Sequence, residues 1–205
     1  MKYITASCVI DRGSVVRNGE LLFEDKDADI SGFLLHIYQH FYFNYPKFYK
    51  MDNLSKLGWL TSEILLKDFK RGQYQPEEIG LVLANKNSSL DDDLKYWESA
   101  KDTASPSLFV YTLPNIVIGE ICIRNNFKGE HAFYIQDEFD ADFIAKQVSY
   151  LLDHDILQAC ICGWVDVLEQ EYKASLFLIE KENHGSSVLF SPGNMDHIFE
   201  TVNKA

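Results

Sequence analysis

The chain has 205 residues, of which 46% are hydrophobic and 24% charged, a composition typical of one globular domain with a sizeable core. Its formal net charge of −12 argues against nucleic acids and anionic membrane surfaces as partners, because both require clustered lysine and arginine. No apolar run reaches the roughly 18 residues of a membrane-spanning helix, and Met1-Lys2-Tyr3 leads directly into a predicted strand, so we expect a soluble, cytoplasmic protein.

The first third of the chain is predicted to contain one strand, a hairpin or irregular segment, and one amphipathic helix. Residues 2–10 alternate and are rich in β-formers, which predicts a strand. Residues 11–30 carry Gly13 and the pair Asn18-Gly19, which favours a hairpin or an irregular excursion. Residues 47–69 predict a turn followed by an amphipathic helix that is capped by Asp52 or Asn53.

The aromatic segment at residues 33–49 contains His36 and His40 at helical spacing. Two histidines four residues apart can present metal ligands on one face of a helix. No acidic residue lies between them and no third ligand is evident in the sequence. We therefore interpret them as histidines packed among aromatic rings, and we expect neither a metal nor a cofactor.

The middle of the chain predicts a strand at residues 77–84, a helix at 91–99 and a helix at 116–124 that opens after Pro114-Asn115. Gly119 lies inside this last helix, where glycine costs roughly 1 kcal/mol against alanine, which suggests close approach by another backbone. Gly129 is suited to a left-handed turn before the next strand.

The remaining elements complete a predicted α/β fold with one mixed sheet of about five strands, in a single domain over residues 1–205. The helices at 115–124 and 139–152 are expected against one face of this sheet, and one side of the second helix is expected to be solvated. A turn at residues 183–185 leads into 187–190. The further predicted elements are strands at 131–136, 156–166 and 173–181 and a terminal helix at 195–202.

The four cysteines are Cys8, Cys122, Cys160 and Cys162, and all lie in apolar stretches. None forms a C-x-x-C pair, and Cys160 and Cys162 lie on one face of a predicted strand. This pattern is typical of buried free thiols in an intracellular protein.

The segment from Ser105 to Gly129 resembles the N-terminal half of β-ketoacyl synthases, which have the thiolase-like fold. Ser105-Pro106, Asn115, Gly119 and Gly129 match the family pattern S-P-x-x-[FV]…PN-x-x-x-G-x-[IL] and the glycine that follows it. The resemblance covers residues 1–182 with gaps, and the C-terminal half with its two further catalytic residues is missing from this sequence.

The family's nucleophilic cysteine is absent at the position that the resemblance assigns to it. Counting onward from Gly129, and back from the strand ILQACICGWVD at residues 156–166, leads to Glu138 in both cases. The polar run at residues 85–89 also replaces the glycine-rich turn that lines the family's acyl pocket. A condensing enzyme needs a thiolate and oxyanion donors, so we expect no independent catalysis.

The resemblance therefore implies a non-catalytic subunit similar to a chain length factor, which pairs with a complete β-ketoacyl synthase in fatty acid, polyketide or aryl polyene biosynthesis. Leu108 and Phe109 are then expected to close the partner's acyl tunnel, and Tyr134 is expected on the strand at the dimer axis. Acyl carrier protein is expected only as an indirect partner, because its recognition surface is acidic like this chain.

Two alternatives remain open. The chain could be a homo-oligomeric structural or interaction protein, in which Leu108 and Phe109 are ordinary core residues. It could also be an acyl transferase or hydrolase that uses Cys160 or Cys162, although reactive cysteines occur at helix N-termini or beside cations and these two lie inside a strand.

Overall fold

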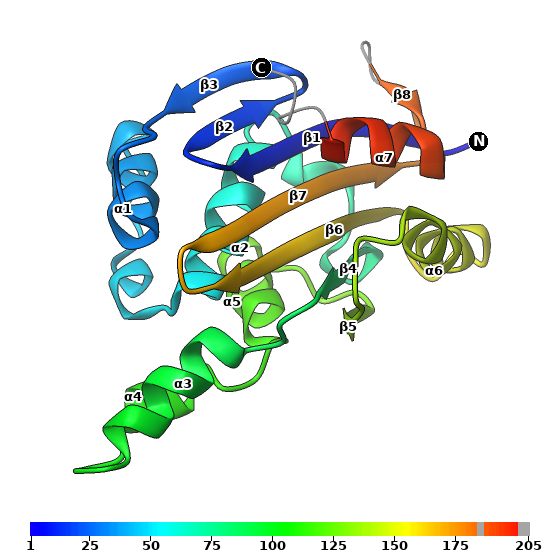
Figure 1. Ribbon diagram of the computed structural model, residues 1–205. Coiled ribbons are helices and arrows are strands. Elements are labelled where there is room, and N and C mark those ends of the chain that lie inside the picture. The colour runs from blue at the N-terminus through cyan, green and yellow to red at the C-terminus, as the bar shows by residue number, and fades with distance from the viewer. Residues whose placement is uncertain (184–186, 201–205) are drawn as a thin grey trace.

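A single mixed sheet runs through the computed structural model, which describes residues 1–183 and 187–200 (Figure 1). Within those residues the strand order is β3-β2-β1-β7-β6-β4-β5, and β8 pairs with the start of β1. The strands are β1 (Tyr3–Asp11), β2 (Ser14–Arg17), β3 (Glu20–Glu24), β4 (Ile79–Asn85), β5 (His131–Ile135), β6 (Ala159–Leu168), β7 (Glu171–Glu180) and β8 (Val188–Leu189).

The five predicted strands are β1, β7, β6, β4 and β5, which are neighbours in the sheet. The expected total of about five is wrong, because residues 11–30 form a hairpin that extends the sheet beyond β1. Asn18 and Gly19 both have positive φ angles of 51° and 81°, as a tight hairpin turn requires. The sheet is mixed as predicted: β4 is parallel to both β5 and β6, whereas β7 is antiparallel to β6 and β1.

Helices cover both faces of the sheet. The helix α5 packs with α1 and α2 in one hydrophobic core, and α6 packs with α7 in another on the opposite face. The helical elements are α1 (Ile30–His40), α2 (Asn53–Leu65), α3 (Leu90–Ser99), α4 (Pro106–Phe109), α5 (Ile116–Asn125), α6 (Ala141–Asp153) and α7 (Pro192–Glu200), with short 3-10 turns at Pro46–Lys50, Arg71–Gln73 and Pro76–Glu78.

The expectation that α5 and α6 share one face is therefore wrong, and the strand order explains why. The connection from β4 through α5 moves outward to β5, and the connection from β5 through α6 returns past β4 to β6. Connections between parallel strands are almost always right-handed, so reversing the direction of travel places the second helix on the other face.

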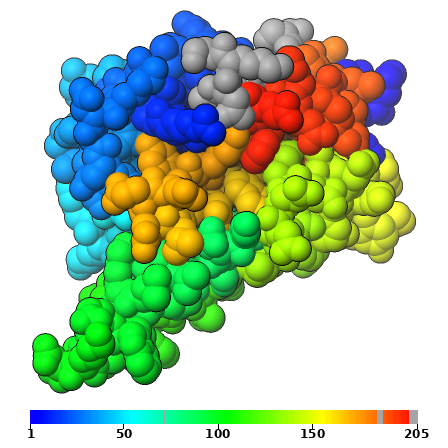
Figure 2. Space-filling view, in the orientation of Figure 1, coloured from blue at the N-terminus to red at the C-terminus, as the bar shows by residue number. Residues whose placement is uncertain are grey.

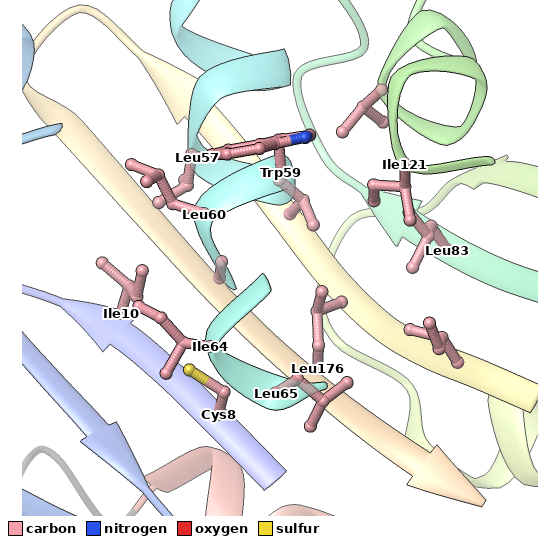
Figure 3. Packing of buried hydrophobic residues seen from close by; sticks show 14 of the residues in the cluster. Cys8, Ile10, Leu57, Trp59, Leu60, Ile64, Leu65, Leu83, Ile121 and Leu176 are labelled. Atoms are coloured by element: carbon pink, nitrogen blue, oxygen red, sulfur yellow. The ribbon is translucent and has the colours of Figure 1, made fainter. Parts of the chain in front are cut away.

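The helix α2 is the centre of the first core (Figure 3). It was expected to be amphipathic, but nearly all of its residues are buried, because the sheet, α1 and α5 surround it. Asp52 caps it as predicted, accepting a hydrogen bond from the Ser55 N–H at 3.0 Å. Gly58 allows α5 to approach, since a Cβ added there would lie 2.3 Å from Cγ2 of Val117.

The second core lies between the sheet, α6 and α7. The side chain of Met195 is fully buried there, and the rings of Phe139 and Phe199 stack with centroids 4.3 Å apart. The other side of α6 is exposed at positions such as Tyr150, as predicted. The terminal helix begins at Pro192, earlier than predicted, and its predicted last residues, like most of the turn predicted at residues 183–185, lie outside the described residues.

The described residues include no helix that is both long and apolar enough to cross a membrane.

Candidate partner interface

The loop between β5 and α6 contains Glu138, the residue that the sequence resemblance aligns with the family's nucleophile. Glu138 is exposed to solvent. The residue that caps α6 is Asp140, whose Oδ1 accepts a hydrogen bond from the Phe143 N–H at 2.8 Å. An exposed carboxylate near a helix N-terminus is favoured by the helix dipole but offers no thiolate chemistry.

The neighbouring loop after β4 is held by hydrogen bonds to the side chains of Asp166 and Asn85. Asp166 at the end of β6 accepts hydrogen bonds from the backbone N–H groups of Lys86 and Asn87 at 3.1 and 2.9 Å. Asn85 is fully buried and accepts a hydrogen bond from the Ser88 N–H at 3.0 Å. These backbone donors are occupied within the chain, so they do not form an oxyanion hole.

Strand β5 ends the sheet on this side, and its outer edge is not covered by another strand of the described chain. On its inner side, the Gln136 N–H donates to the Asn85 carbonyl at 2.9 Å, and Glu130 accepts from the Leu81 N–H at 3.2 Å. Because alternate residues of a parallel pair face the neighbouring strand, the Phe133 and Ile135 N–H groups point outward. The strand, HAFYI, contains neither proline nor lysine, the residues that commonly protect an edge from pairing.

Tyr134 lies in β5 as predicted, but its side chain points toward α6. Its ring meets Phe143 edge-on with centroids 4.8 Å apart, and its hydroxyl donates to Oε1 of Gln147 at 3.3 Å. Tyr134 therefore contributes to the packing of α6, whereas Ile135, 53% exposed, presents its side chain to solvent.

A helical arm formed by α3 and α4 projects from the body of the molecule (Figures 1 and 2). The Ser105 side chain accepts a hydrogen bond from the Leu108 N–H, which caps the short helix α4. Leu108 is half-buried and Phe109 is 61% exposed, with its ring 5.5 Å from that of Tyr96. Phe109 is therefore not a core residue of this chain.

The arm carries further exposed apolar side chains that the sequence reasoning missed. Leu90, Leu94 and Trp97 recur at helical spacing along α3, and Trp97 is 70% exposed. The spacing of these apolar residues was the available signal, but periodicity alone predicts a buried face. Only the projection of the arm shows that this stripe is uncovered.

Asn115 and Gly119 lie at the start and in the first half of α5. Asn115 is exposed and makes no side-chain capping hydrogen bond. A Cβ added at Gly119 would meet nothing within 4 Å, so the expected close approach by another backbone does not occur within this chain. The same helix ends differently from the prediction, because Asn126, and not Gly129, has the left-handed conformation, with φ of 58°.

Gly129 serves close packing and not a left-handed turn. A Cβ added there would lie 2.5 Å from the carbonyl oxygen of Ile79.

The cysteines are buried free thiols, apart from Cys122, which is half-buried. Burial raises the pKa of the Cys160 thiol to about 12 and the pKa of Cys162 well above its usual range. Cys160 and Cys162 share the face of the sheet that packs against α6, as predicted. Both thiols stay protonated near neutral pH, which weighs against the cysteine-dependent alternative.

His36 and His40 lie on α1 without forming a metal site. His36 Nδ1 is 2.7 Å from Oδ2 of Asp25, and the His40 ring packs against Phe23 and Phe41. Across residues 1–183 and 187–200, no group of three or more histidine, cysteine or acidic side chains is arranged to hold a metal ion.

The chain resembles solved structures far more than it resembles sequences. No family model matches it, and no curated protein matches it. A structure described as the ishigamide ketosynthase/chain length factor superposes with a TM-score of 0.65 at 15% identity, over 90% of this chain and 63% of that chain.

Two further structures agree. The ketosynthase ApeO in complex with its chain length factor ApeC, from Xenorhabdus doucetiae, gives a TM-score of 0.54 at 12% identity, over 78% of this chain and 73% of that chain. The complex AntDE:AntF, a type II polyketide synthase acyl carrier protein with its ketosynthase, gives 0.57 at 12% identity, over 87% of this chain and 62% of that chain.

The chain has the ketosynthase and chain length factor fold. The resemblance read from Ser105 to Gly129 is thus confirmed at the level of fold. In the ishigamide and AntDE:AntF structures, the chain spans less than two thirds of the protein it matches.

Proposed function

We propose that the chain is a non-catalytic subunit, similar to a chain length factor, that pairs with a complete β-ketoacyl synthase. The observation that carries this proposal is the uncovered edge of β5, and the sequence resemblance, which aligns Glu138 of the adjoining β5–α6 loop with the nucleophile, supports it. The neighbouring structures are described as ketosynthase and chain length factor pairs, which supports the same arrangement for this chain.

In this arrangement β5 would hold the two subunits together, and the ketosynthase would carry out the condensation reaction. Backbone N–H and C=O groups along the free edge can form a continuous ladder with a strand of the partner. Leu108 and Phe109 need no chemistry in this role, since a tunnel is closed by rigid apolar bulk.

The product would belong to polyketide, aryl polyene or fatty acid biosynthesis. Acyl carrier protein would dock on the ketosynthase and not on this acidic chain, because like charges at an interface are repulsive. In this role the subunit would need no cofactor, and the chain would act in the cytoplasm.

The same edge supports a second candidate, a homodimer. Two copies of β5 could pair antiparallel about a two-fold axis, since such an interface uses the same surface on both subunits. The first candidate predicts that a ketosynthase copurifies with the chain and that the pure chain is monomeric. The second predicts that the pure chain is dimeric.

Substitution of Ile135 by lysine tests the proposed pairing. Lysine on the open edge places a charge where a partner strand must dock, and it leaves α6 untouched. The tagged chain is isolated from its source cells and its companions are identified by mass spectrometry. We expect a β-ketoacyl synthase to accompany the wild type and to be lost from Ile135→Lys.

Leu21→Lys is the matched control, because Leu21 is 55% exposed on β3, the strand at the opposite end of the sheet. This control should retain the ketosynthase. Wild-type protein that is dimeric by light scattering, with no ketosynthase recovered, would establish the homodimer instead.

A further inference from the structure

The base of the arm contains a carboxylate that has no partner. Asp92 lies in the first turn of α3 and is 1% exposed. Neither of its side-chain oxygens forms a hydrogen bond with any described residue. An ionised carboxylate without a partner is among the most costly groups to bury.

The hydrogen-bond donors near Asp92 in the sequence and on the β6–β7 turn bind other acidic side chains. On α3, the Lys95 ammonium pairs with Asp91 at 2.6 Å, and Asp93 accepts a hydrogen bond from the Ser89 hydroxyl at 3.3 Å. From the β6–β7 turn, the Glu169 N–H donates to Oδ1 of Asp91 at 2.9 Å.

Among residues 1–183 and 187–200, no cation forms an ion pair with Asp92 from the other elements that pack on α3. At the N-terminus of α2, Asp52 accepts hydrogen bonds from that helix's own backbone, and the one cation of α2, Lys56, lies over the Phe48 ring at 5.7 Å from its centroid. Asp166 on β6 is held by Lys86 and Asn87. The helix α4 contains no titratable side chain.

Asp92 therefore keeps its proton more strongly than an ordinary aspartate does. Burial is the main cause and the nearby Asp52 carboxylate adds to it, and together they raise the pKa of Asp92 to about 7, against the opposing effect of Lys95. The carboxyl group thus changes charge near neutral pH while it lies between the arm and the body.

We propose that protonation of Asp92 holds the arm against the body, and that loss of this proton releases it. The release of the arm would also make pairing with the ketosynthase depend on pH, because the arm carries Leu108, Phe109 and the apolar stripe of α3. This consequence rests on the proposed function. The release itself is a property of the isolated chain and can be measured without any partner.

The direction of the effect follows from the two pKa values of Asp92. When the arm opens, Asp92 returns to its ordinary pKa of about 4, so the packed form binds more protons than the open form at any pH between about 4 and 7. Packing is then most stable at acidic pH, and the equilibrium constant for opening rises by up to about tenfold per pH unit in this interval, levelling off above it.

Hydrogen exchange of the arm amides, residues 90–113, tests the proposal on the full chain at pH 5.5, 6.5 and 7.5. Rates are corrected for the intrinsic pH dependence of exchange, and the amides of α6 serve as an internal reference. We expect opening of the wild-type arm to increase at least tenfold across this range. In Asp92→Asn, which is neutral at every pH, opening should change less than twofold.

Glu98→Gln is the matched control, because it removes one negative charge from α3 at a side chain that is 70% exposed. It should behave like the wild type. Asp92→Leu provides a second neutral variant in case the asparagine perturbs the packing, and it should also be insensitive to pH. Equal pH dependence in the wild type and both Asp92 variants, or no pH dependence in the wild type, would overturn the proposal.

If the ketosynthase pairing fails while the arm responds as expected, only the proposed function is lost. If pairing occurs but its affinity is the same at pH 5.5 and 7.5 although the arm opens, the arm does not regulate the pairing.

Discussion

Individual side chains in this protein show how burial changes chemistry. The sequence resemblance implies a nucleophilic cysteine, yet Cys160 and Cys162 lie inside the sheet, where thiolates are disfavoured. Glu138, which the sequence resemblance aligns with that nucleophile, is exposed to solvent in the β5–α6 loop. The exposed loop position thus carries no thiol, and the thiols of β6 are not exposed.

Alkylation by iodoacetamide separates buried thiols from a reactive one. At pH 8 and 25 °C we expect Cys160 and Cys162 to remain unmodified in the native protein, because burial raises the pKa of Cys160 to about 12 and that of Cys162 well above its usual range, so both contain almost no thiolate. Cys122, half-buried with a pKa raised to about 11, should react slowly, and all four should react in denaturant. Rapid native labelling of Cys160 or Cys162, measured by mass spectrometry, would revive the acyl transferase hypothesis.

Two glycines are expected to respond to alanine in opposite directions. Gly163 on β6 has φ of +140°, and an added Cβ would lie 2.0 Å from the Ser175 carbonyl oxygen, so Gly163→Ala should reduce the free energy of unfolding by about 3 kcal/mol or more. Gly119→Ala should increase it by about 0.5–1 kcal/mol, because the site is open and helical. Urea titration measures both, and loss of stability at Gly119 would contradict the open site.

At the scale of elements, the molecule separates a stable body from two uncovered features. The arm of α3 and α4 has its apolar side chains outward, and β5 has a free edge. Both lie in one chain segment, which consists of β5 and the connection at residues 86–130 that joins β4 to it. A connection this long between adjacent parallel strands exceeds what α5 alone needs, and the extra length forms the arm.

Shortening the apolar side chains of α4 tests the proposed role of the arm in setting the length of the acyl product. In a reconstituted pair with the ketosynthase, Phe109→Ala or Leu108→Ala should yield longer products at similar total flux, because a tunnel ends where the blocking side chain ends. Each added methylene that is buried contributes about 0.8 kcal/mol, enough to shift a product distribution. Mass spectrometry of the products decides the matter: unchanged lengths from an assembled pair would leave the arm an interaction element only.

At the scale of the whole molecule, two separate cores stabilise the sheet. The first depends on α2, buried on almost every side, and the second depends on α6 and α7. The second core contains fewer buried residues than the first, and on its side of the sheet it is covered only by α6, whose outer side is solvated, and by α7 among the described residues.

Met195→Ala measures how much α7 contributes to this second core. The side chain is fully buried, so its removal should reduce the free energy of unfolding by about 2–4 kcal/mol. Glu200→Ala, an exposed position on the same helix, should change it by less than about 0.5 kcal/mol. Similar effects of both variants in urea titration would mean that α7 does not seal the core.

The amino-acid sequence alone predicted the elements and the fold class, because periodicity and turn residues act locally. The strands at residues 77–84 and 173–181, the cap at Asp52 and the shared face of Cys160 and Cys162 all follow from neighbours within a few positions. Ser105, Pro106 and Asn115 also carried the resemblance to the ketosynthase fold without any coordinates.

Tertiary structure decided what depends on distant parts of the chain. The direction in which each connection crosses the sheet put α5 and α6 on opposite faces, and no local pattern encodes that direction. Periodicity marks Leu94 and Trp97 as one apolar stripe but does not say whether anything covers it. The unpaired state of Asp92 likewise depends on Lys95 and the Glu169 N–H, which both bind Asp91. From sequence alone, a charged residue in a helix is predicted to face solvent, and only the packing around it shows otherwise.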